Sequence, residues 1–207
     1  MASWLSLPEV KRSFPVLHLI TSLTVIAPCN HKRVDTRILL HVRDAPTPSE
    51  FTKVGLRTVG KDVIAISIGV FEGIEGLDKF GSSWGTGVNR RVFAIHDIFL
   101  GSNRARALPV FHAFTGCDTV SSKGEKSAWQ TWIRYDDVTA AFLACSSMSE
   151  DSQERIERFV VLFYDRTSRN SLVNEERKQL FAEKGRPMGA IPPTKGANKV
   201  SAIDTQL

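Results

Sequence analysis

The chain has 207 residues, 42% of them hydrophobic, and its 27 lysines and arginines outnumber its 22 acidic residues to give a net charge of +5. These values exclude a wholly disordered chain and allow one substantial core with a tail. The positive charge is compatible with nucleic-acid binding, although it is common among other proteins too. Cys29, Cys117 and Cys145 lack the close pairwise spacing of a structural zinc site, which favours a reducing compartment.

The first apolar run spans residues 14–29 and follows Lys11 and Arg12. Its composition is also that of the hydrophobic part of a secretion signal, but it contains Pro15 and His18 and is too short to span a bilayer. We favour a buried strand, and secretion is the minority interpretation. The predicted location is intracellular, nuclear or cytoplasmic, without membrane association.

A helix and a strand follow this run. Val34, Ile38 and Val42 recur at helical spacing, which predicts an amphipathic helix over residues 33–43. Asp35 falls in its first turn, where the helix dipole favours an acid, so the spacing alone favours a helix-end charge over a metal ligand at this position. After the turn sequence PTPSE, the sequence KVGLRT predicts a strand.

The next apolar run, DVIAISIGVF, fits either a buried strand or a short helix. Asp62 opens it just beyond the carboxyl end of the preceding strand, where open α/β sheets bind ligands, although a helix N-cap explains Asp62 equally well. GSSWGTG lacks the Gly-Lys-Ser/Thr ending of a phosphate loop, so we predict a turn between two strands, the second in RVFAIHDI. His96 and Asp97 would point apart on that strand, which argues against a catalytic pair.

Two helices are predicted in the C-terminal part. SEDSQERIERFVVLFYDRTS places apolar residues on one helical face, and Asp151 with Glu154 forms a capping-box pattern at its start. SLVNEERKQLFAEKG predicts a second helix with Gly185 as its terminator. From Arg186 onward the chain is rich in proline and glycine, so we expect it to be extended and partly disordered.

Three blocks of sequence carry a resemblance when they are taken together. They are VDTRILLHVRDA (34–45), LRTVGKDVIAI (56–66) with WGTGVNRRVFAIHDI (84–98), and LPVFHAFTGCDTVSS with KGEKSAWQTW (108–132). In this order and spacing they resemble an uncharacterised, multi-copy animal family of mobile-element type, whose blocks read HEEADTR, TVDTDV and HAFTGCDT. That family resembles, more distantly, the PIN-like and flap-endonuclease superfamily.

The resemblance implies an α/β, PIN-like three-layer fold with a central, mainly parallel sheet, followed by a helical C-terminal part. It implies a nuclease-related core over residues 1–132 that lacks its N-terminal part, a helical extension over 133–185 and a disordered tail over 186–207. In such nucleases, carboxylates hold Mg²⁺ or Mn²⁺ for the cleavage of phosphodiesters. The metal-binding positions that the resemblance implies are Asp35, Asp62 and Asp118.

The chain departs from the family pattern beside these positions. Lys32 and Arg33 stand where relatives have acids, and Gly60 and Lys61 replace the first carboxylate of TVDTDV and its neighbour. Three carboxylates remain where an intact two-metal site gathers roughly four or more. Nearby cations also stabilise ionised aspartates without metal. We therefore expect a degenerate domain with weak or no cleavage and assign no catalytic residue.

Two alternatives remain open. The first is a noncatalytic module that contacts the phosphates of DNA or RNA. Its candidate contacts are Arg104, Arg106, Lys123 and Lys126. The competing structural interpretation makes Trp129 and Trp132 core anchors and the lysines a solvated helix end. The second alternative is a gene remnant without function.

Overall fold

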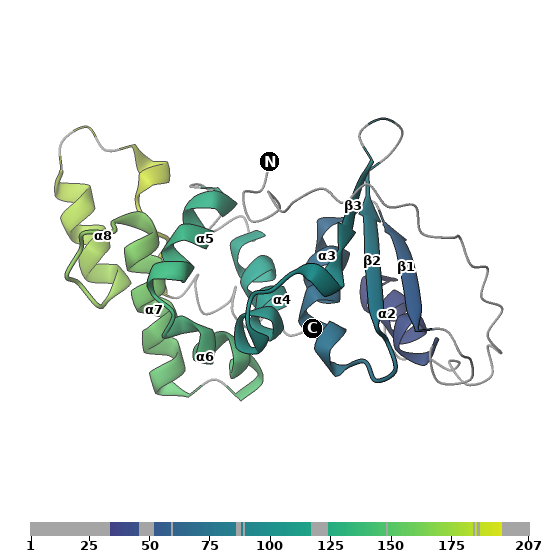
Figure 1. Ribbon diagram of the computed structural model, residues 1–207. Coiled ribbons are helices and arrows are strands. Elements are labelled where there is room, and N and C mark those ends of the chain that lie inside the picture. The colour runs from purple at the N-terminus through teal and green to yellow at the C-terminus, as the bar shows by residue number, and fades with distance from the viewer. Residues whose placement is uncertain are drawn as a thin grey trace. The chain divides into compact units, whose positions relative to one another are not determined.

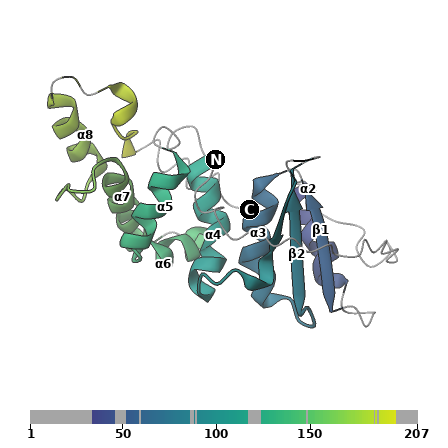
Figure 2. The same ribbon diagram turned by 45° about the horizontal axis from the view of Figure 1, so that its top comes forward.

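The computed structural model describes residues 34–45, 52–58, 60–85, 88, 90–116, 124–147, 149–183, 185 and 187–195. The structure is mixed α/β and mostly helical, with three described strands in one sheet. The chain divides into two compact units, one of residues 7–109 and one of residues 110–207 together with residues 1–6. Figures 1 and 2 show the sheet in the first unit and a group of packed helices in the second.

The sheet of the first unit has the strand order β1-β2-β3, formed by β1 (Lys53–Thr58), β2 (Lys79–Trp84) and β3 (Arg91–Ala94). β1 and β2 are parallel, whereas β2 and β3 are antiparallel. The predicted strand KVGLRT is confirmed. The predicted reversal between two strands is also found, but GSSWGTG is not all turn, because Gly81–Trp84 belong to β2. The expected mainly parallel sheet is not what the described strands form, because β3 runs antiparallel to β2 and makes the sheet mixed.

Helix α3 (Lys61–Val70) and the 3₁₀ turn η2 (Phe71–Gly73) connect β1 to β2. Parallel strands need such a crossover because a hairpin turn would make them antiparallel. The apolar run that fitted either a strand or a helix is thus a helix. Its buried residues are Val63, Ile64, Ala65, Ser67 and Ile68.

Helix α2 (Val34–Asp44) packs on α3 and confirms the helix predicted over residues 33–43. Its buried residues include Leu39 and Val42, whereas Arg37 and Arg43 are exposed. This division of apolar and basic side chains between two faces is the amphipathic pattern that the sequence predicts.

The chain turns away from β3 sooner than the sequence suggests. RVFAIHDI was expected to be strand, but β3 ends at Ala94 and η4 (Ile95–Asp97) is a 3₁₀ turn. The His96 side chain contacts the backbone of Phe80 in β2, where a further residue of β3 would otherwise pair. Its Nδ1 lies 2.8 Å from the carbonyl oxygen of Phe80 and 3.2 Å from the Phe80 nitrogen. Its Nε2 lies 3.6 Å from Asp97 Oδ1, so the two side chains do not point apart.

Helix α4 (Ser102–Gly116) starts in the first unit and ends in the second. Its Pro109 lies against α3: a Cβ built on Gly69 would come within 2.6 Å of Pro109 Cγ and 3.2 Å of the Ala105 carbonyl oxygen. Only a residue without a side chain allows α3 and α4 to approach this closely.

The second unit contains α5 (Glu125–Arg134), α6 (Val138–Leu143), η6 (Cys145–Ser147), α7 (Glu150–Tyr164), α8 (Val173–Ala182) and η7 (Met188–Ala190). Its core is aromatic. Phe111 stacks on Trp132 with ring centroids 4.3 Å apart, and both contact Phe142 edge-on. Trp132 Nε1 donates a hydrogen bond to Thr139 Oγ1 at 2.8 Å. Trp132 is therefore a core anchor, as the structural interpretation expects, whereas Trp129 is half-buried and contacts Phe111 and Trp132 edge-on.

The two predicted C-terminal helices are confirmed as α7 and α8, but their ends differ from the predictions. Ser149 is the N-cap of α7, where its Oγ accepts a hydrogen bond from the Ser152 nitrogen at 3.1 Å. The Asp151–Glu154 capping box is therefore wrong, and Asp151 instead pairs with Arg155 at 2.8 Å. α8 ends at Ala182, three residues before the positive-φ Gly185.

Residues 187–195, which fall within the predicted tail, contact α7 and α8 within the second unit. Ile191 is buried, and Arg177 donates a hydrogen bond to the Pro192 carbonyl oxygen. Lys195 Nζ lies 2.8 Å from Oε2 of the buried Glu157. Over these residues the structure differs from the expected disorder because two charged contacts and one apolar contact fix the chain.

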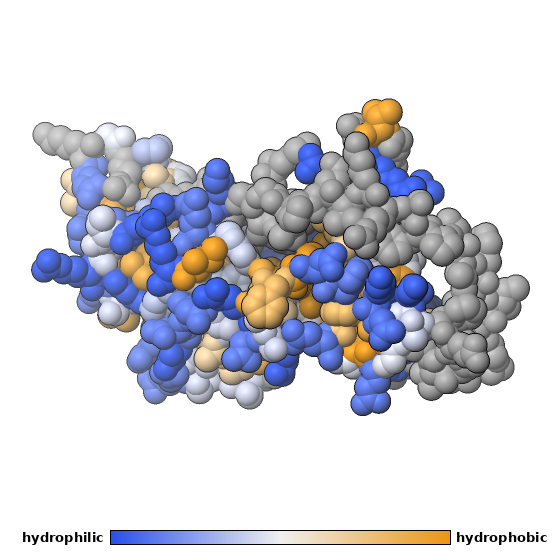
Figure 3. Space-filling view, in the orientation of Figure 1, coloured by the Kyte–Doolittle hydropathy of each residue, from blue (hydrophilic) through white to orange (hydrophobic). Residues whose placement is uncertain are grey.

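On the face seen in Figure 3 the described surface is mainly hydrophilic, with scattered apolar spots. Among the described residues, the exposed large apolar side chains are Val88, Phe99, Ile133, Leu172, Phe181 and Met188. Among the described helices, none is both long and apolar enough to cross a membrane. The apolar run at 14–29, predicted to be a buried strand, lies outside the described residues.

Candidate functional site

Asp62 lies beyond the carboxyl end of β1, as the sequence predicts, in the first turn of the helix that follows the strand. It is the second residue of α3, two positions after the N-cap residue Gly60, and its side chain is exposed. The Gly60 nitrogen donates a hydrogen bond to Thr58 Oγ1 at 3.1 Å, which links the end of the strand to the start of the helix. Asp62 is therefore not the N-cap, but it lies in the first turn, where the helix dipole stabilises its negative charge.

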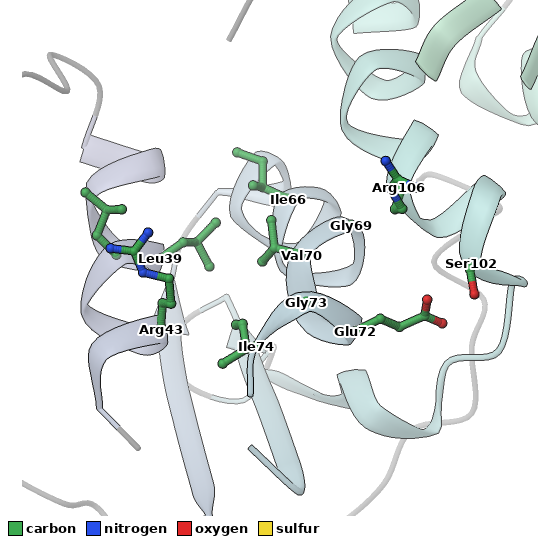
Figure 4. A pocket seen from close by; sticks show the side chains of 11 residues that line it. Leu39, Arg43, Ile66, Gly69, Val70, Glu72, Gly73, Ile74, Ser102 and Arg106 are labelled. Carbon is green, nitrogen blue, oxygen red and sulfur yellow. The ribbon is translucent and has the colours of Figure 1, made fainter. Parts of the chain in front are cut away.

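Asp35 occupies the equivalent position on the neighbouring helix. It is the second residue of α2, as Asp62 is of α3, and its backbone position alone is described. Figure 4 shows α2 and α3 side by side and running in the same direction, with Leu39 before Arg43 on one and Ile66 before Val70 on the other. The helices thus begin at the same end, toward the carboxyl edge of β1.

The structure does not describe all of the predicted site residues. Asp118 and Lys123 lie outside the described residues, so the predicted convergence of three aspartates stays a prediction. Within the ranges that the structure describes, no three His, Cys, Asp or Glu residues gather as a possible metal site.

The cations predicted to contact phosphates lie on two helices. Arg104 and Arg106 are on the N-terminal half of α4, where Arg104 is half-buried and Arg106 exposed. Lys126 is exposed in the first turn of α5, in the second unit. Its exposure at the start of α5 is equally what the structural interpretation predicts, in which the lysine is solvated at a helix end.

A pocket of about 630 Å³ lies in the first unit, between helices α2, α3 and α4 and the turn η2. We call it the α2–α3 pocket (Figure 4). It is lined by Leu39, Leu40, Arg43, Ile66, Gly69, Val70, Glu72, Gly73, Ile74, Ser102 and Arg106.

Sequence reasoning identified Arg106 as a candidate phosphate contact and missed the pocket around it. Leu39 and Arg43 are one turn apart, as are Ile66 and Val70, so their spacing marks two helix faces. Nothing in this spacing predicts that the faces lie side by side, because the packing of α2 on α3 and of α3 on α4 joins segments that are distant in the sequence. No family model, curated protein or solved structure matches the chain.

Proposed function

We propose that this chain is a degenerate PIN-like nuclease domain, with weak or no metal-dependent cleavage of nucleic acid. The observation that carries the proposal is the β1–α3–β2 crossover, with Asp62 exposed in the first turn of the helix that follows the strand. The carboxyl edge of such a strand pair is where α/β sheets commonly bind ligands and place reactive groups. A nuclease site of the expected kind would need its acids at this edge.

The charges beside Asp62 support the degenerate form of this site. Mg²⁺ requires oxygen ligands, and Gly60 supplies no side-chain oxygen where relatives have an acid. Lys61 places a cation next to Asp62 in the chain. The amino-terminal end of α3 carries a partial positive charge, which disfavours a divalent cation unless several carboxylates offset it.

A second candidate function is noncatalytic binding of nucleic acid. It is favoured by exposed Arg106 on α4 and exposed Lys126 on α5, whose charges are accessible to phosphates. Such binding needs no metal, because lysine and arginine contact phosphate oxygens directly. The two functions are separable, since the second survives the loss of every carboxylate at the edge of the sheet.

The test measures cleavage and metal affinity on the whole chain. Single-stranded, flap and duplex substrates with Mg²⁺ or Mn²⁺ should be cleaved little or not at all. Restoring acids with Gly60→Asp, Lys32→Glu and Arg33→Glu together should raise divalent-ion affinity in calorimetric titrations. Robust cleavage by the unmodified chain that is abolished by Asp118→Asn would show that three aspartates suffice and that the site is intact.

A matched control separates a rebuilt site from a general increase in negative charge. Lys53 and Lys79 are exposed and opposite each other at the amino ends of β1 and β2, away from the proposed site. Changing both to glutamate alters the net charge by nearly as much as the three restoring changes. Equal gains in divalent-ion affinity for the two variants would contradict a site at the carboxyl edge.

A further inference from the structure

We propose that the α2–α3 pocket binds an amphipathic monocarboxylate, with its carboxylate on Arg106 and its apolar part between α2 and α3. The proposal does not depend on nuclease ancestry. The described residues that line the pocket all belong to the first unit, and its volume of about 630 Å³ suits a small ligand. Ligand pockets commonly measure about 300–1,000 Å³ and combine apolar walls with a few polar groups.

The apolar wall comes from both helices. Leu39 of α2 reaches toward α3, and Val70 of α3 faces it (Figure 4). Leu40, Ile66 and Ile74 extend the apolar lining. A hydrocarbon segment placed there would remove apolar surface from water, which contributes about 25 cal/mol for each Å² buried.

The polar lining favours a single negative charge. Arg43 and Arg106 contribute two cations, and Glu72 contributes one anion. The two cations and one anion of the described lining leave a net charge of +1, which a single carboxylate balances. A monoanion therefore neutralises the lining, whereas a neutral lipid leaves it positively charged and a phosphate dianion leaves an excess of negative charge.

Arg106 is the residue best suited to hold the carboxylate. It lines the pocket from α4, it is exposed, and it forms no ion pair with another residue in the described ranges. Its planar guanidinium matches the two carboxylate oxygens, so both can accept hydrogen bonds. Arg43 lies on α2 and already interacts with another group, which leaves it the weaker candidate.

Two glycines shape the pocket in different ways. Gly69 fixes the approach of α3 to α4, so the Arg106-bearing wall is held in place before a ligand arrives. Gly73 also lines the pocket, and a Cβ there would meet no atom within 4 Å. A larger side chain at Gly73 is thus a means of filling the space without disturbing the helices.

The experiment compares decanoate with 1-decanol on the full chain, by NMR titration below the concentrations at which either ligand aggregates. The two ligands share an apolar chain and differ in charge. Decanoate should bind more tightly than decanol, and Arg106→Gln should weaken decanoate binding about tenfold while leaving decanol unchanged. Gly73→Leu should weaken the binding of both.

Arg104→Gln is the matched control, because Arg104 is two residues away on α4 and does not line the pocket. It should leave both affinities unchanged. Far-UV circular dichroism of each variant checks that the helices are retained. The proposal is overturned if decanoate produces no saturable shifts at the pocket residues, if decanoate and decanol bind equally, or if Arg104→Gln weakens decanoate binding as much as Arg106→Gln.

Discussion

Gly69 of α3 lies so close to Pro109 of α4 that a Cβ at this glycine would come within 2.6 Å of Pro109 Cγ and 2.9 Å of Pro109 Cδ. The proline ring is rigid, and the Ala105 carbonyl oxygen lies 3.2 Å from the same point, so neither neighbour can yield by a side-chain rotation. The contact sets the spacing of the two helices that form one side of the α2–α3 pocket.

Gly69→Ala should therefore destabilise the protein by about 1–3 kcal/mol, as overpacking in a closed contact does. Helix propensity alone would make this variant more stable, because alanine is a better helix former than glycine by up to about 1 kcal/mol. A loss of stability would therefore show that the steric contact outweighs helix propensity. Urea unfolding followed by circular dichroism measures the change. Gly73→Ala is the control, since its Cβ would meet no atom within 4 Å, and it should be neutral or stabilising. An equal effect at both glycines would contradict the steric explanation.

The His96 side chain should contribute to the stability of the protein, because it contacts the β2 backbone at Phe80, next to the last pair of the β2–β3 ladder. Its Nδ1 lies 2.8 Å from the Phe80 carbonyl oxygen, in a half-buried site where an unsatisfied carbonyl is costly. His96→Ala should lower the free energy of unfolding by about 1–2 kcal/mol.

Two amide variants distinguish this hydrogen bond from general packing at His96. An asparagine amide can reach the position of Nδ1, whereas the longer glutamine places its amide near the position of Nε2. His96→Asn should recover part of the lost stability and His96→Gln less. Recovery by glutamine alone would indicate that the contact of Nε2 with Asp97 matters more.

The helices that were predicted most closely are those whose pattern is local. In α2, the apolar positions and the basic ones separate at helical spacing, so burial of Val42 follows from the sequence. The cap of α7 was missed because acids in a first turn look alike whether they cap the helix or follow the cap. Ser149, two residues before Asp151, makes the capping bond.

Features that depend on distant segments could not be predicted in the same way. The run that forms α3 is apolar enough for a strand or a helix, and the parallel β1–β2 pair requires the crossover. The local turn sequence predicted a reversal between β2 and β3, whereas the mainly parallel sheet was inferred from the family resemblance and from the position of Asp62 beyond a strand. For the site, Asp62 was placed correctly beyond β1, while the pocket beside Arg106 depends on helix packing.

The contact between Lys195 and Glu157 should make stability depend on pH in the alkaline range. The hydrogen bond that Lys195 donates to Glu157, together with the charge of Glu157, raises the pKa of Lys195 above its usual 10.5. The charged lysine is therefore favoured by folding. Its contribution is complete below pH 10.5 and is lost as the pH rises through the raised pKa.

Lys195→Met removes this titration and keeps much of the side-chain length. The difference in free energy of unfolding between the unmodified chain and this variant should be constant at neutral pH and should shrink above about pH 10.5. The effect should be small because the Lys195 side chain is 42% exposed and solvent screens the pair. A difference that grows with pH would have the wrong sign for this ion pair.

Salt dependence tests whether the start of α5 contacts nucleic acid. Each phosphate contact that is lost should reduce the slope of log affinity against log salt concentration by about 0.9 for duplex DNA and about 0.7 for single strands. Lys123→Ala with Lys126→Ala should therefore flatten the slope by nearly two units for duplex DNA if both lysines bind phosphates. Lys178→Ala, at an exposed position on α8, controls for the loss of positive charge elsewhere in the second unit. An unchanged slope in the double variant would mean that Lys126 is a solvated helix end above a core anchored by Trp132, whose side chain is buried.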